Sequence, residues 1–133
     1  FETLGLRPGR MYAWMSVLVE IVAGIALAIG FLTPLAAGAI IGVMVVAGVI
    51  EHRRNGFFVF RNGYEYVLMI GVICVGLSIS GPGSIAADAE LGLSLPAGVV
   101  GSVLAVALGV GGAILLLASA WRPAPARAPS RVE

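Results

Sequence analysis

One carboxylate lies in the middle of a long apolar stretch. Glu20 is nine positions into the segment 11–32, roughly 13 Å along a helix and therefore near the centre of a bilayer. Ionisable residues at that depth are costly, and they usually face a bundle interior or a watery cavity where they bind a proton, an ion or a ligand. A protonated or hydrogen-bonded Glu20 that fixes helix packing is the structural alternative. The sequence leaves both interpretations open.

A second group of polar residues surrounds a basic loop, residues 52–63. Tyr and Arg side chains are common at membrane boundaries, so one interpretation is an interfacial anchor. The other is a polar pocket for a quinone-like or other amphipathic ligand, with an arginine or histidine donating to a carbonyl and Glu20 lying deeper. The candidate residues are His52, Tyr64, Glu65, Tyr66, Arg53, Arg54 and Arg61.

Several kinds of chemistry have no motif in this sequence. One histidine and one cysteine, Cys74, do not make a zinc site. There is no glycine-rich phosphate loop, nucleophile elbow or dinucleotide fingerprint. The basic run Arg53-Arg54 is too short to indicate nucleic acid. We therefore expect no metal, no intrinsic cofactor and no nucleic-acid partner, and any redox cofactor is expected to be small, exchangeable or carried by a partner.

The composition excludes an ordinary water-soluble domain. Of the 133 residues, 59% are hydrophobic and 11% charged, against roughly 25% charged in soluble domains. Stretches long enough to cross a bilayer recur along the chain. We predict an all-α fold, a polytopic membrane bundle of four transmembrane helices within residues 11–121, after a connecting segment, 1–10, and before a disordered Pro/Arg-rich tail, 122–133. The predicted spans are 11–32, 35–51, 64–80 and 96–121.

Breaks and small residues shape this bundle. Thr33-Pro34 is predicted to make a tight turn between the first two helices, and Gly81-Pro82-Gly83 a turn after the third. The fourth span carries a stripe of small residues suited to close helix packing. The apolar part of the loop 52–63 is too short to span, so we expect it at the interface or folded back into the bundle. The stripe is Gly101, Ala105, Gly109 and Ala113.

The arginines fall on one side of a four-span arrangement, whereas Asp88 and Glu90 fall on the other. Short cytoplasmic loops carry an excess of positive charge. We therefore predict that the arginine-rich loops and the C-terminal tail face the cytoplasm. The arginines are Arg7, Arg10, Arg53, Arg54, Arg61, Arg122, Arg127 and Arg131.

Four short segments form a recognisable pattern when they are taken in order. They are Leu4-Gly5-Leu6 with Pro8; Glu20, Gly24 and Gly30-Phe31-Leu32-Thr33; His52 with Asn55-Gly56-Phe57-Phe58; and Gly63-Tyr64-Glu65-Tyr66 with Gly81-Pro82-Gly83-Ser84-Ile85-Ala86-Ala87-Asp88. Their order and spacing over residues 4–88 resemble the DoxX family, small bacterial and archaeal membrane proteins of about four helices.

The resemblance implies a function. The family is named after a subunit of a thiosulfate or quinol oxidoreductase system, so we expect an accessory or anchoring subunit of a quinone-linked oxidoreductase in the bacterial cytoplasmic membrane. A quinone is then the candidate cofactor, and membrane lipid and a redox enzyme are the expected partners. The resemblance also implies that a helix preceding residue 1 is absent from this sequence. It directs attention to Glu20, His52, Glu65 and the structural turn of Gly81, Pro82, Gly83 and Asp88.

Two other functions compete with that expectation. A small proton- or cation-coupled transporter or permeability factor would use Glu20 and require a homo-oligomer, because four short helices barely enclose a pathway. A non-catalytic membrane scaffold would need no ligand. The sequence also departs from the family pattern: Thr33-Pro34 stands where members often have Thr followed by Arg, and the last span extends beyond the usual end of the pattern.

Overall fold

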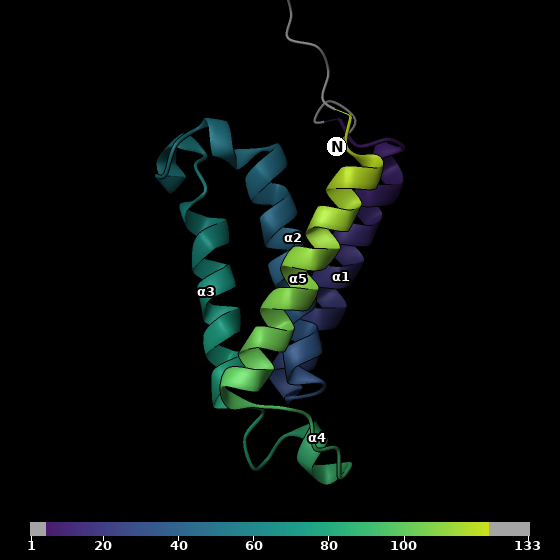
Figure 1. Ribbon diagram of the computed structural model, residues 1–133, viewed down its shortest axis with the longest axis vertical. Coiled ribbons are helices and arrows are strands. Elements are labelled where there is room, and N and C mark those ends of the chain that lie inside the picture. The colour runs from purple at the N-terminus through teal and green to yellow at the C-terminus, as the bar shows by residue number, and fades with distance from the viewer. Residues whose placement is uncertain (1–4, 123–133) are drawn as a thin grey trace, which may run out of the picture.

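The computed structural model describes residues 5–122, so residues 1–4 and the predicted tail beyond Arg122 lie outside the description. The described part contains no strand, only an isolated bridge between Leu6 and Trp121. Figure 1 shows its helices. They are α1 (Gly9–Ile29), α2 (Thr33–Ile50), α3 (Glu65–Ser80), the one-turn α4 (Ala87–Glu90) and α5 (Gly98–Ala120), with 3-10 turns η1 (His52–Arg54) and η2 (Val59–Arg61).

The prediction of an all-α membrane bundle is confirmed. Three helices, α1, α2 and α5, are long and apolar enough to cross a membrane. The fourth, α3, has 16 residues, which corresponds to about 24 Å. Large apolar side chains are exposed along α1, α3 and α5, as expected of helices that face lipid, whereas Leu35 is the one such side chain on α2. The chain is therefore built as a membrane protein with α2 at its centre, because α2 packs against α1, α3 and α5.

The turn between α1 and α2 lies earlier than the sequence suggested. The chain leaves α1 at Gly30, which has a φ of 66°, and Leu32 has a φ of 47°. Thr33 and Pro34 are the first residues of α2 instead of forming the break. The physical reason is that proline fits the first turn of a helix, whereas the left-handed conformation needed to leave α1 suits Gly30.

The small-residue stripe of α5 faces α2. Gly101, Ala105, Gly109 and Ala113 are all buried. A Cβ added to Gly38 of α2 would lie 3.0 Å from the carbonyl oxygen of Ala105. Small residues therefore bring the two helix backbones into direct contact, and the stripe is used within the chain.

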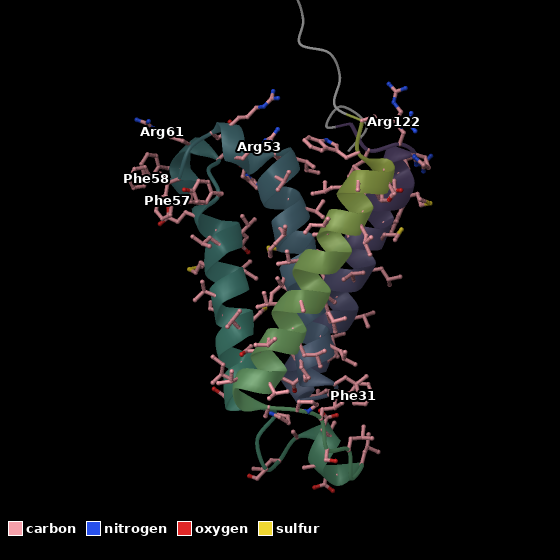
Figure 2. All side chains as sticks on the ribbon, viewed as in Figure 1. Phe31, Arg53, Phe57, Phe58, Arg61 and Arg122 are labelled. Carbon is pink, nitrogen blue, oxygen red and sulfur yellow. The ribbon has the colours of Figure 1, made fainter. Side chains whose placement is uncertain are left out.

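The arginines of residues 5–122 gather at one end of the bundle. Figure 2 shows Arg53, Arg61 and Arg122 at the end where α2 is joined to α3, with Phe31 at the opposite end. The short helix α4, which contains Asp88 and Glu90, lies at the Phe31 end (Figure 1). Asp88 and Glu90 are thus at the end opposite these arginines, whereas Glu51 and Glu65 lie at the arginine end.

Candidate functional site

A groove runs between α1, α2 and α5. It has a volume of about 560 Å³, and its walls are largely apolar side chains and backbone at small residues. Gly38 and Gly42 of α2 lie in its wall, as do Gly109 and Gly112 of α5. The absence of side chains at these four glycines leaves room for a ligand beside the helices, a geometry common for binding sites in helical bundles.

Three polar residues of α1 line this groove at a spacing of four. Tyr12, Ser16 and Glu20 occupy one face of the helix, and the hydroxyl of Ser16 donates a hydrogen bond to Oε1 of Glu20 at 3.3 Å. Glu20 lies eleven residues after Gly9, about 16 Å along a helix of about 30 Å. The stripe therefore leads from one end of α1 to the centre of the bilayer.

The charged residues that line this groove are both acidic, Glu20 and Glu51. Glu51, directly after α2, also lines it, and no arginine or histidine does. Within residues 5–122, no basic side chain forms an ion pair with Glu20, whose hydrogen bond comes from Ser16 alone. A carboxyl group at this depth is costly without a partner. The groove thus presents a hydrogen-bonding group that a bound molecule can satisfy.

The residues around the basic loop lie apart from Glu20. His52 and Glu65 hold the loop: Nδ1 of His52 lies 2.9 Å from the carbonyl oxygen of Asn62, and Oε2 of Glu65 accepts the backbone N–H of Val59 at 2.9 Å. Neither residue lines the groove that contains Glu20. The structure therefore does not bring Glu20, His52 and Glu65 together, and it gives the latter two a structural role in the loop.

The aromatic and basic residues of this loop are displayed at the surface. The ring of Tyr64 lies 5.4 Å from that of Phe57 in an edge-on arrangement, and Tyr66 is exposed on α3. The guanidinium of Arg53 lies 5.3 Å from the centre of the Trp121 ring, whereas Arg54 and Arg61 are exposed. The apolar part of the loop lies at the surface and does not fold back into the bundle.

The turn residues form a separate structural unit at the other end. Gly81 ends α3 with a φ of 75°, and Pro82 and Gly83 follow. Asp88 is 1% exposed, and its Oδ1 accepts the backbone N–H of Leu32 at 2.9 Å. The loop that contains Asp88 therefore packs against the α1–α2 turn.

The chain was compared with family models, curated proteins and solved structures. Residues 1–53 match the DoxX family model. The match confirms the resemblance over α1, α2 and His52, and with the apolar helices it identifies a membrane protein. It contains Glu20 and ends before Glu65 and Asp88. No curated protein and no solved structure matches this chain.

Sequence reasoning missed the other polar residues that line the groove with Glu20. Tyr12, Ser16 and Glu51 are not among the candidates from the sequence. The signal that finds two of them is the spacing of four along α1, which places Tyr12, Ser16 and Glu20 on one helix face. Glu51 has no such signal, because its place beside the groove follows from the packing of α1 on α2.

Proposed function

We propose that this DoxX-like chain is an accessory membrane subunit that binds a quinone in the α1–α2–α5 groove and supports a quinone-linked oxidoreductase. The observation that carries the proposal is the hydrogen-bonded Ser16–Glu20 pair in the wall of an otherwise apolar groove. Such a groove accepts a molecule with an apolar tail and a small polar head.

The polar stripe fits the head of a quinone. A quinone carbonyl accepts hydrogen bonds, and a quinol hydroxyl donates them. The hydroxyls of Tyr12 and Ser16 supply donors, and the carboxyl group of Glu20 accepts from a quinol or, when protonated, donates to a quinone. The apolar tail would lie against the glycine-rich faces of α2 and α5. The chain itself holds no redox group in this proposal, so electrons come from the oxidoreductase partner.

We expect Glu20→Gln to lower the quinone retained per protein about tenfold, because a hydrogen bond to a charged group contributes about 1.5–3 kcal/mol. Gly112→Phe should abolish retention by filling the groove, since no atom lies within 4 Å of a Cβ at that position. The measurement is organic extraction of the protein purified in mild detergent. Gly111→Phe is the matched control, because its Cβ is equally unhindered and Gly111 does not line the groove. Equal retention in both phenylalanine variants would contradict the proposal.

The partner is tested in the same preparation. We expect mass spectrometry of the material that co-purifies from the native membrane to show an oxidoreductase in stoichiometric amount. A homogeneous protein with no quinone and no partner would reject the accessory-subunit function. It would favour the scaffold.

A proton or cation pathway is the second candidate, and the lack of a basic partner for Glu20 in the described part of the chain favours it. A carboxyl group inside a membrane is a common site for a transported proton or cation. This function predicts flux into proteoliposomes that stops in the Glu20→Gln variant. Flux that is insensitive to Glu20 and to the pH gradient would exclude it.

We infer that the arginine end of the bundle faces the cytoplasm of a bacterial cell, on the basis of the positive-inside rule. Phe60→Cys and Ile85→Cys place thiols at exposed positions on the two loops. We expect an impermeant thiol reagent applied outside to label residue 85 at least tenfold faster than residue 60. The native Cys74 is buried and provides a low background. Faster labelling at residue 60 would reverse the orientation.

A further inference from the structure

A second groove lies between α2 and α3, on another side of the molecule from Glu20. Its volume is about 450 Å³, and Tyr64 is the one lining residue with a polar side-chain group. Val45 and Val49 of α2 and Val67 and Leu68 of α3 are among the apolar residues that form it. An open groove of this kind within a bilayer accepts a hydrocarbon chain and offers little to a polar solute.

The depth of this groove corresponds to one leaflet. On α3 it extends from Tyr64 to Val75, and on α2 from Ile41 to Val49. Eleven residues of helix cover about 16 Å, which is about half of a hydrocarbon core roughly 30 Å thick. One end of the groove is at Tyr64, next to the loop with the arginines. An acyl chain that starts at that interface would therefore end near the middle of the bilayer.

The loop at this end is basic and is held in place. Arg53 and Arg54 are in η1 and Arg61 is in η2, and within residues 5–122 no carboxylate forms an ion pair with them. Backbone N–H groups of Tyr64 and Glu65 donate to the carbonyl oxygens of residues 56 and 57 at 3.1 and 2.9 Å. The loop thus carries three guanidinium groups, the side chains best suited to phosphate. Those of Arg54 and Arg61 are exposed, and that of Arg53 lies 5.3 Å from the centre of the Trp121 ring.

Aromatic side chains place the same loop at the membrane interface. Phe57, Phe58 and Phe60 are 43%, 51% and 76% exposed, and the rings of Phe58 and Phe60 stack with centroids 5.1 Å apart. Exposed phenylalanines beside basic residues are typical of segments that lie in the headgroup region of a bilayer. Figure 2 shows Phe57 and Phe58 on the same loop as Arg61. The arginines are therefore at the depth of lipid phosphate groups.

We propose that the α2–α3 groove and the arginines of the adjoining loop together bind one anionic phospholipid. Its acyl chain lies in the groove, and its phosphate lies at the basic loop that carries Arg53, Arg54 and Arg61. Charge complementarity favours an anionic lipid over a zwitterionic one, because no described carboxylate forms an ion pair with these three arginines, which outnumber Glu51 and Glu65 on the same segment, and each basic group near an anionic surface contributes about 1 kcal/mol. The site is separate from the Glu20 groove, so it does not depend on quinone binding.

The first test uses the full chain in nanodiscs or mild detergent, with phosphatidylglycerol and phosphatidylcholine as probes in native mass spectrometry. We expect the wild type to retain one phosphatidylglycerol at least tenfold more than phosphatidylcholine. Gly71→Phe should remove the bound lipid, because Gly71 lines the groove and a Cβ at this position meets no atom within 4 Å. Gly76→Phe is the matched control on α3, equally unhindered and outside the groove. Loss in both variants, or in neither, would overturn the proposal.

The second test addresses the headgroup. Replacing Arg53, Arg54 and Arg61 together with glutamine should abolish the preference for phosphatidylglycerol, whereas replacement with lysine should retain most of it because the charge remains. Soluble glycerol phosphate should not displace the lipid. Displacement at equal concentration would show that the site binds a free phosphate ester and would overturn the lipid assignment. A preference that survives the glutamine replacements would also overturn it.

Discussion

Replacing Gly109 with alanine is expected to lower the free energy of unfolding by about 1–3 kcal/mol, the usual cost of overpacking a close contact. A Cβ at this position would lie 2.6 Å from the carbonyl oxygen of Gly38 and 2.7 Å from Cγ2 of Ile41. The Gly38 oxygen belongs to the backbone of α2 and cannot turn aside, so the two helices must separate. Because α2 also contacts α1 and α3, the separation disturbs the centre of the bundle.

The measurement is the midpoint of unfolding in mild detergent. Gly111→Ala is the control, since the same change two residues away meets no atom within 4 Å. The control should be neutral or more stable, because alanine favours a helix over glycine by about 1 kcal/mol. Equal midpoints for the two variants would mean that the contact between α2 and α5 is looser than the structure indicates.

This contact illustrates what the sequence was able to predict. Membrane spans follow from the length of the apolar runs, and the stripe of Gly101, Ala105, Gly109 and Ala113 follows from small residues at every fourth position. The partner of the stripe does not follow. Small-residue faces are equally suited to contacts within a chain and between chains, and only the packing of α5 on α2 decides between them.

The sequence alone identifies one residue of the candidate site, Glu20, but it does not predict the groove around that residue. A carboxyl group at mid-span identifies Glu20 from the sequence alone. In a helix that is apolar on every side, however, the hydrophobic pattern does not state which face meets the protein and which meets lipid. The groove therefore depends on the rotation of α1 against α2. In the basic loop, the sequence identifies a polar residue but not its role. Glu65 is a ligand-binding candidate in the sequence, whereas in the structure its carboxylate accepts the backbone N–H of Val59.

The sequence assigns Asp88 to the structural turn with Gly81, Pro82 and Gly83, and its burial follows from a contact with a residue 56 positions away in the sequence. Its Oδ1 accepts the N–H of Leu32, the residue that precedes α2 and has no capping side chain of its own. Oδ1 of Asp88 thus takes the place of a helix cap at the positive end of the α2 dipole, whereas Oδ2 is buried without a hydrogen-bond partner in the described part of the chain. No local sequence pattern reports an interaction over this separation.

Asp88→Ala is therefore expected to lower the free energy of unfolding by about 1–3 kcal/mol, because it leaves the partly buried N–H of Leu32 without its acceptor. Asp88→Asn keeps an oxygen at that position and should retain more than half of the stability. Glu90→Ala, on the same short helix and exposed, should leave the unfolding midpoint unchanged. Equal losses in the alanine and asparagine variants would contradict the hydrogen-bond explanation and assign the effect to the charge beside α2. The comparison of these variants tests whether the loop after α3 stabilises the turn between α1 and α2. That turn sets the orientation of α1, which places Glu20 in its groove.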